Sequence, residues 1–174
     1  EALLTSQEKF RAIFNQAPIG FEIYDSDGWL VNVNNASLNI YGLTDLSDFH
    51  EYNIFNDPCL NEDLMNKLRK IETVAYQLIY DFDEVKETNR YKTNRNGKAC
   101  LEHLITPISE ANSGTALGYL MQIQDVTERK RIEREINMLA QALKSINECV
   151  SITDMENKLI FVNQSFINTY GYSL

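Results

Sequence analysis

The 174 residues include 16 Lys and Arg against 25 Asp and Glu, which gives a net charge of −9 and an acidic pI of about 4.7. With 44% hydrophobic and 24% charged residues, the composition is that of an ordinary globular chain of about one domain. The acidic balance argues against a nucleic-acid binder, because phosphate neutralisation needs a basic face.

Membrane and disulfide signals are weak in this sequence. No run approaches the roughly 18 apolar residues that a membrane helix needs, and residues 1–10 do not have the layout of a secretory signal. The chain begins with Glu1, so we expect a longer parent protein that an additional segment could anchor to a membrane. The three scattered cysteines, Cys59, Cys100 and Cys149, favour reduced thiols in the cytoplasm over a disulfide framework or a metal site.

The first predicted elements form a hairpin followed by a helix. Residues 21–24 alternate in polarity and end in the turn 25–28, and a second apolar strand follows at 30–33. Asn34 then opens a short helix that ends at Tyr41-Gly42.

The middle of the chain predicts small helices and then three more strands. Brief helical turns extend to Pro58, and residues 61–71 are amphipathic at helical spacing. Strand-like runs follow at 74–85, 98–108 and 117–126, and turn chemistry at 94–97 and 110–114 indicates hairpins between them. Together these elements predict an α+β fold, with one five-stranded antiparallel sheet and small helices on one face.

A charged helix is expected after the last strand. Residues 128–135 read ERKRIERE and cannot be core. On a helix, Arg129 and Glu133 are four residues apart and can pair, and so can Arg131 and Glu135. Two readings remain open, a single helix that packs back on its own domain and a connecting helix that pairs with its twin in a homodimer. The apolar positions, spaced by 4, 3, 4 and 3, are Ile132, Ile136, Leu139, Leu143 and Ile146.

The end of the chain repeats its beginning. Shifted by 129 residues, positions 14–42 align without a gap with 143–171, including Asp25 with Asp154, Asn34 with Asn163 and Gly42 with Gly171. Duplication explains both the identities and the shared order of strand, turn, strand and helix. The alternative is a chance likeness between two hairpins.

These residues resemble a known family. The hairpin at 23–33 with Asn34-Asn35-Ala36-Ser37 and Tyr41-Gly42, together with Gly118 to Ile123 leading into Asp125-Val126-Thr127-Glu128-Arg129-Lys130, is similar to a PAS domain with its C-terminal PAC segment. Val126 stands where Ile is usual. The resemblance covers roughly residues 8–130, and 147–174 look like an incomplete second PAS domain. We therefore expect a PAS domain at 1–127, a signalling helix at 128–146 and the second start at 147–174, as in tandem regions of bacterial sensor histidine kinases.

The resemblance also implies a function. PAS domains are sensory and dimerisation modules whose inner sheet face and small helices enclose a pocket. Plain core packing is the alternative for each pocket candidate, since cores and pockets use the same residue types. The candidates are Ile23, Leu38, Tyr41, Ile54, Phe55, Leu64, Leu68, Tyr80, Leu104, Met121 and Ile123.

No cofactor is indicated. The segment Asp57-Pro58-Cys59-Leu60 lacks the Arg and Phe of the motif in flavin-photoadduct PAS domains, which argues against covalent flavin. A haem needs an axial histidine. His50 is expected at the surface and His103 is expected to be a satisfied sheet histidine, so both argue against haem. The two distant histidines and lone cysteines also argue against a metal.

Catalytic signatures are also missing from the sequence. The seven glycines form no phosphate-binding motif, and no nucleophile motif is present. The acidic residues Asp81, Asp83 and Glu84 are expected on a solvated strand edge. We expect no catalytic site in this fragment.

Two functions remain from different classes. In the first, the chain senses a small ligand or redox state for a two-component histidine kinase. The resemblance implies kinase domains and a response regulator as its partners. As an alternative output, the sensor could belong to a cyclic-dinucleotide synthase or a transcriptional regulator. In the second, it is a ligand-free interaction module. For the first, we expect Asp125, Thr127 and Arg129 to transfer the signal, with Asp125 and Thr127 capping the exit helix.

Overall fold

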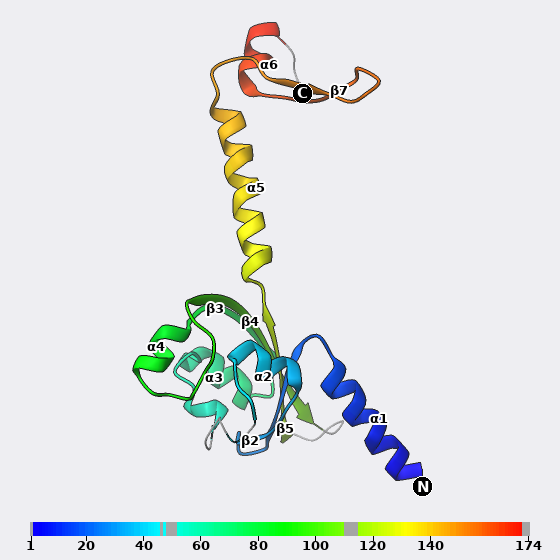
Figure 1. Ribbon diagram of the computed structural model, residues 1–174, viewed down its shortest axis with the longest axis vertical. Helices are drawn as coiled ribbons and strands as arrows, with labels where there is room; N and C mark the ends of the chain where they lie inside the picture. Colours follow the sequence, from blue (N-terminus) through cyan, green and yellow to red (C-terminus); the bar gives the residue numbers. More distant parts are fainter. Residues whose placement is uncertain (1, 46, 48–51, 110–114, 172–174) are drawn as a thin grey trace. The chain divides into compact units, whose positions relative to one another are not determined.

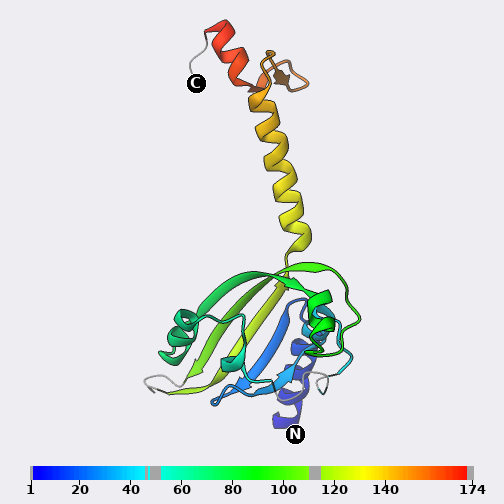
Figure 2. The same ribbon diagram turned by 90° about the vertical axis from the view of Figure 1, so that its left-hand side faces the viewer.

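The computed structural model describes residues 2–45, 47, 52–109 and 115–171, and it divides into two units, residues 1–127 and 128–174. Five antiparallel strands form the sheet of the first unit in the order β2-β1-β5-β4-β3 (Figures 1 and 2). This confirms the expected α+β class and the five-stranded sheet. The strands are β1 (Gly20–Asp25), β2 (Leu30–Val33), β3 (Val74–Asp81), β4 (Lys98–Ser109) and β5 (Ala116–Asp125).

Short helical segments cover one face of this sheet, as Figures 1 and 2 show for α2, α3 and α4. Asparagines begin three of the segments, because Asn34, Asn53 and Asn61 each accept a hydrogen bond from a backbone N–H two or three residues later. The helical elements of the first unit are α1 (Ala2–Gln16), α2 (Asn35–Tyr41), the 3-10 turn η2 (Ile54–Asn56), α3 (Glu62–Arg69) and α4 (Phe82–Glu87).

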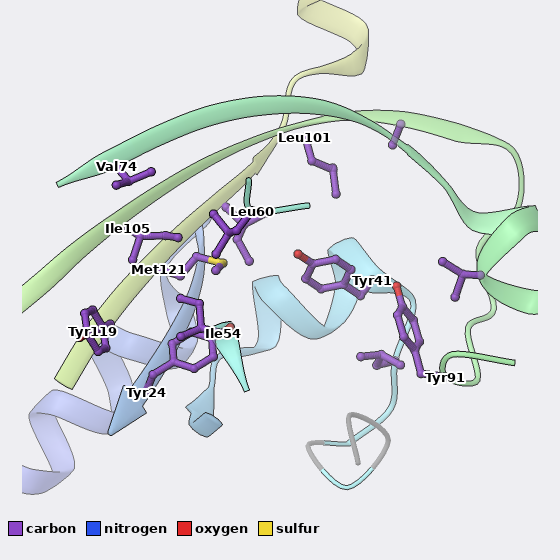
Figure 3. Close-up of a cluster of buried hydrophobic side chains, with 14 of the residues drawn as sticks. Tyr24, Tyr41, Ile54, Leu60, Val74, Tyr91, Leu101, Ile105, Tyr119 and Met121 are labelled. Carbon is purple, nitrogen blue, oxygen red and sulfur yellow. The ribbon is translucent and has the colours of Figure 1, made fainter. Parts of the chain in front are cut away.

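The core lies between the inner sheet face and these segments. Figure 3 shows Ile105 and Met121 pointing from the sheet toward the ring of Tyr41, which comes from α2. Ile54, Leu68 and Ile105 are fully buried, so helical and strand residues share one cluster. The inner face therefore carries both the stability of the unit and its candidate ligand site.

One predicted strand is wrong in its second half. Residues 74–85 were expected to be one strand, but β3 ends at Asp81 and α4 begins at Phe82. The Asp81 carboxylate accepts hydrogen bonds from the N–H groups of Asp83 and Glu84 and so caps α4, while the side chain of Phe82 is fully buried. The acidic cluster is therefore the first turn of a helix, and Asp81 also contacts Lys98 at 2.9 Å.

The hairpin expected at 94–97 is also wrong, because α4 and a loop connect β3 to β4. The glycine in that segment still has a positive φ of 69°, as its turn chemistry suggested. The other expected turn, 110–114, lies outside the described residues.

The second unit repeats the start of the first at an offset of 129 residues. It contains α5 (Thr127–Ser145, beginning at the last residue of the first unit), β6 (Ser151–Thr153), β7 (Leu159–Val162) and α6 (Gln164–Tyr170). Asp25 accepts hydrogen bonds from the second and fourth N–H groups after it, at 3.0 and 2.8 Å, and Asp154 does the same at 3.1 and 2.8 Å. Both hairpins have a register shift at the same position. The agreement in detail favours duplication over a chance likeness.

Helix α1 is an element that the sequence did not predict. It ends at Gln16, and α5 ends at Ser145, which is again an offset of 129. The five heptad-spaced apolar residues between 132 and 146 form what we call the seam of α5. At the offset of 129, four of them correspond to apolar residues at positions 3, 10, 14 and 17, and this correspondence is the signal for α1 in the sequence. The repeating unit is therefore a helix followed by a hairpin and a second, short helix.

The second hairpin is expected to be weakly protected from amide hydrogen exchange. Three of its apolar side chains are exposed, with 46% for Ile152, 49% for Leu159 and 66% for Ile160, and Phe161 and Val162 are only half-buried, because two strands cannot bury a face alone. We expect amides of β6 and β7 to exchange on the order of 100-fold faster than those of β1 and β5. Equal protection at low protein concentration, measured by NMR or mass spectrometry, would contradict this prediction.

Candidate functional site

The inner face of β1 carries a buried acid. The Glu22 carboxylate is 2% exposed and accepts a hydrogen bond from the Ser37 hydroxyl at 2.6 Å and another from the Tyr24 hydroxyl. Burial raises the pKa of Glu22 above its ordinary value, although both hydrogen bonds act in the opposite direction. A second acid, Asp57, is also buried and raises it slightly further. The interior therefore disfavours added negative charge.

A histidine lies farther across the same face. His103 on β4 is 5% exposed, and its Nε2 is hydrogen-bonded to the Tyr41 hydroxyl at 3.1 Å. Its ring stacks on Tyr76, its partner on β3, with 4.7 Å between the centroids and 3° between the planes. Burial lowers the pKa of His103 to about 4, so the imidazole is neutral near pH 7.

Two buried polar atoms in this pair lack a hydrogen-bond partner, the Tyr76 hydroxyl and Nδ1 of His103; among the described side chains no others do. His103 was expected to be a sheet histidine with both ring nitrogens hydrogen-bonded. Only its Nε2 has a hydrogen-bond partner, the Tyr41 hydroxyl, and its Nδ1 has none. Buried polar groups are nearly always paired, so this pair marks the point where the interior could accept a polar ligand or a water molecule.

Further tyrosines surround this point. The ring of Tyr41 meets that of Tyr80 edge to face at 5.5 Å, and the Tyr80 and Tyr91 hydroxyls are hydrogen-bonded at 3.0 Å. Nearby, burial and Asp57 raise the pKa of Cys59 to about 11, which disfavours the thiolate. The residue types suit a small ligand held by ring contacts and a few hydrogen bonds.

Most of the pocket candidates meet in one cluster, and two do not. Ile23 and Leu104 are outside the inner cluster, since each lies next in sequence to inner-face residues and therefore points to the other side of the sheet. The nine in the cluster are Tyr41, Ile54, Leu68, Met121 and Ile123, which are buried, and Leu38, Phe55, Leu64 and Tyr80, which pack against them.

The outer face has a hollow of its own, of about 490 Å³. Its lining contains two rungs of paired residues across β3, β4 and β5, Ala75 with Leu104 and Gln122, and Gln77 with Glu102 and Gln124. Ile19, Tyr76 and His103 complete the lining. The small side chain of Ala75 leaves space between its longer neighbours. Leu104 therefore lines a hollow, but on the face opposite to the expected one.

The exit from the last strand is held by a network that includes Asp125 and Thr127. The Asp125 carboxylate accepts hydrogen bonds from the backbone N–H of Thr127 at 3.0 Å and from its hydroxyl. The Thr127 hydroxyl in turn accepts a hydrogen bond from the Cys100 N–H of β4 at 2.8 Å. Asp125 therefore holds the first N–H of α5, whereas Thr127 ties α5 to the sheet.

Arg95 completes this network and was missed from the sequence, where it appeared only as part of a turn. Its guanidinium donates to the Asp125 carboxylate at 2.9 Å and to the Ile40 carbonyl at 2.8 Å, and it lies over the Phe82 ring at 4.6 Å. Partial burial alone would raise the pKa of Asp125, but the hydrogen bonds from Thr127 and the ion pair with Arg95 hold it below its ordinary value. The last residue of β5 is thus bound to the end of α2.

Helix α5 itself exposes its apolar seam, with Ile132 at 45%, Ile136 at 60% and Leu139 at 59%. Of the other two expected seam residues, Ile146 is exposed and Leu143 is half-buried. Arg131 contacts Glu128 at 2.7 Å and Glu135 at 3.9 Å, and Arg129 lies in the first turn.

In the part of the chain that the structure describes, no three His, Cys, Asp or Glu side chains gather into a possible metal site, and none of the helices is long and apolar enough to span a bilayer. Cys59, Cys100 and Cys149 are free thiols. His50 lies outside the described residues.

Comparison with known proteins supports this description of the fold. The family model of the PAS domain matches residues 18–128 and 147–173. Similar solved structures include the PAS domain of an HTR-like protein from Haloarcula marismortui, with 18% identity over 71% of this chain and 94% of that one and a TM-score of 0.50. An RNA-binding light-oxygen-voltage receptor has 17% identity over 82% of this chain and 39% of its own, with a TM-score of 0.58.

The light-oxygen-voltage protein of Rhodobacter sphaeroides is also similar, with 14% identity over 71% of this chain and 68% of that one and a TM-score of 0.51. At these identities the likeness concerns the fold alone. No curated protein matches the chain.

Proposed function

The chain belongs to the PAS domain family, and from that premise we propose that its first unit senses a small molecule on the inner sheet face and passes the change through β5 to α5. The observation that carries this proposal is the network at the exit of β5. It joins the last strand, the neighbouring strand and the first turn of α5 through Asp125 and Thr127.

The candidate ligand site is connected to this network through residues in contact. The Tyr41 hydroxyl meets His103 in the interior, and the Tyr41 carbonyl accepts a hydrogen bond from the Thr93 hydroxyl at 2.6 Å. The same hydroxyl accepts a hydrogen bond from the N–H of Arg95, whose side chain reaches Asp125. A ligand that moves Tyr41 would therefore change the support of the exit strand, provided that it binds two arrangements unequally.

The ligand itself is proposed to be a small, uncharged molecule. Glu22 and Asp57 make the interior acidic, and a neutral His103 cannot balance an anion. Such a ligand would satisfy the Tyr76 hydroxyl and Nδ1 of His103, the two unpartnered atoms.

The output is proposed to be a dimeric sensor histidine kinase in the cytoplasm. The exposed seam of α5 supports a helix that pairs with a second copy, because an apolar stripe at heptad spacing is buried by such pairing. Kinase domains and a response regulator would then be the downstream partners. Sequencing the parent gene beyond the codon for Leu174 tests this output, and an open reading frame without a phosphorylatable helical hairpin and an ATP-binding domain would overturn it.

The transfer to α5 is tested by a change in the interior combined with a change at the junction. Met121→Ala leaves a cavity beneath β5, and we expect it to alter amide exchange of residues 128–133 several-fold by relaxing the strand. In an Asp125→Ala/Thr127→Ala background the same change should have no effect there. Asp63→Ala, which removes an exposed carboxylate on α3, is the control background. Unchanged exchange in the Met121→Ala protein with an intact junction would contradict the proposal.

A further inference from the structure

The far end of helix α5 is contacted by Ser165, whose hydroxyl donates to the Ile146 carbonyl at 2.9 Å, and chiefly by the side chain of Asn163. The amide nitrogen of this residue donates to the carbonyls of Glu148 at 2.8 Å and Ile146 at 3.1 Å, with a longer contact to Leu143 in the last turns of α5 at 3.5 Å. The side chain is 1% exposed although most of this unit is open to solvent. The last carbonyls of a helix have no partner within it, and Leu143 is the acceptor that lies in α5, whereas Ile146 and Glu148 follow its end at Ser145.

The oxygen of the same amide has a different set of partners. It accepts hydrogen bonds from the N–H of Val150, just before β6, at 2.9 Å and from the N–H of Phe166 in α6 at 3.0 Å. The acceptor side of Asn163 therefore builds the hairpin and caps α6, while the donor side holds the incoming helix.

The first unit contains the same arrangement 129 residues earlier. The amide nitrogen of Asn34 donates to the carbonyls of Phe14 in α1 at 2.9 Å and Ile19 at 2.8 Å. Its oxygen accepts hydrogen bonds from the N–H groups of Phe21 and Ser37 at 2.8 and 2.9 Å. Every one of these partners has its counterpart at Asn163, so the arrangement belongs to the repeat and not to one loop.

We infer that Asn163 is a positioning residue that receives the change carried by α5 and imposes it on the second hairpin, and that Asn34 does the same for α1. The inference rests on the proposed function, in which α5 carries the signal. Helix α5 would then be fixed at its start by Asp125 and Thr127 and at its end by Asn163. The first unit would likewise respond to two inputs, a ligand in its interior and the helix that enters it.

Asn163→Asp distinguishes the hydrogen bonds that the side-chain nitrogen donates from those that the side-chain oxygen accepts. Aspartate is a good helix cap, so the bonds to Val150 and Phe166 can remain. The donors to the carbonyls of Leu143, Ile146 and Glu148 are lost, and the bond from the Ser165 hydroxyl to Ile146 stays in place. The matched control is Asn168→Asp, the same change on α6 at an exposed residue that accepts a hydrogen bond from Gln164.

The test is a set of residual dipolar couplings measured on the whole chain. In the unaltered protein and in Asn168→Asp, we expect couplings of residues 136–145 and of the β6–β7 hairpin to fit one alignment tensor. In Asn163→Asp they should need two, while the secondary chemical shifts of α6 stay unchanged. A single tensor in Asn163→Asp, or two tensors in the unaltered protein, would overturn the inference.

Thr127→Ala then separates this inference from the proposed function. If Asn163 acts as inferred, the changes in amide chemical shift that Thr127→Ala causes along α5 continue into the β6–β7 hairpin. In the Asn163→Asp background these changes stop at residue 146. Shifts that pass equally in both backgrounds would overturn the receiving role of Asn163. If Thr127→Ala changes no amide chemical shift of α5, the proposed function fails. The dipolar couplings still decide whether Asn163 fixes the orientation of α5 relative to the hairpin.

Discussion

Replacement of Asn34 with Ala is expected to lower the free energy of unfolding of the first unit by roughly 3 to 5 kcal/mol. The Asn34 side chain is completely buried and takes part in four hydrogen bonds with backbone groups of α1, β1 and α2 and the residue before β1. Alanine would leave those groups without partners where water cannot easily replace the amide. The sole tryptophan, Trp29, lies in this unit and reports its unfolding in urea by fluorescence.

Two further variants show whether the effect comes from the hydrogen bonds. Asn39→Ala removes an exposed asparagine from α2 and should change stability by less than about 0.5 kcal/mol. Asn34→Asp keeps the two acceptor bonds and should fall between the unaltered protein and Asn34→Ala. A loss below about 1 kcal/mol in Asn34→Ala would show that the surrounding backbone finds other partners.

Acidification is expected to destabilise the first unit through His103, by about 3 kcal/mol in total. Burial lowers the pKa of this residue in the folded state to about 4, against an ordinary value of 6.5 in the unfolded chain. The unfolded chain therefore binds the proton first. Stability from this group is fully present above pH 6.5, falls as the pH drops toward 4, and is lost below that.

His103→Phe isolates this contribution, because carboxylates also titrate in the lower part of the range. Phenylalanine keeps an aromatic ring against Tyr76 and has no titratable nitrogen. We expect urea midpoints of the variant to fall less steeply between pH 6.5 and 5 than those of the unaltered protein. Parallel curves would mean that the imidazole is protonated in the folded state as readily as in water.

The elements that the sequence predicted well are those built from local hydrogen bonds. The cap at Asn34, the turn at Asp25 and the glycine with positive φ at Gly42 each involve partners within a few residues, and their residue types are specific for that geometry. The same local pattern recurs at 150–171, and for this reason the repeat was detectable without a structure.

The failures have physical causes too. Residues 80–83 alternate between aromatic and acidic side chains, which suits a strand, but the Asp81 cap and the burial of Phe82 turn the chain into α4. Ile23 and Leu104 have the residue types of a pocket wall, and only the strand register shows that they lie on the outer face. Composition does not distinguish the two faces of a sheet when both carry apolar residues.

The sequence by itself determined the order of the five strands along the first unit, the repeat and the heptad spacing of apolar residues along α5, because each depends on residues that are close along the chain. Only the tertiary structure decided which side chains meet across long separations. It brought Arg95 to Asp125, which lies 30 residues away, and His103 to Tyr41, which lies 62 residues away. These contacts depend on the pairing of distant strands and on burial, and no spacing in the sequence encodes either of them.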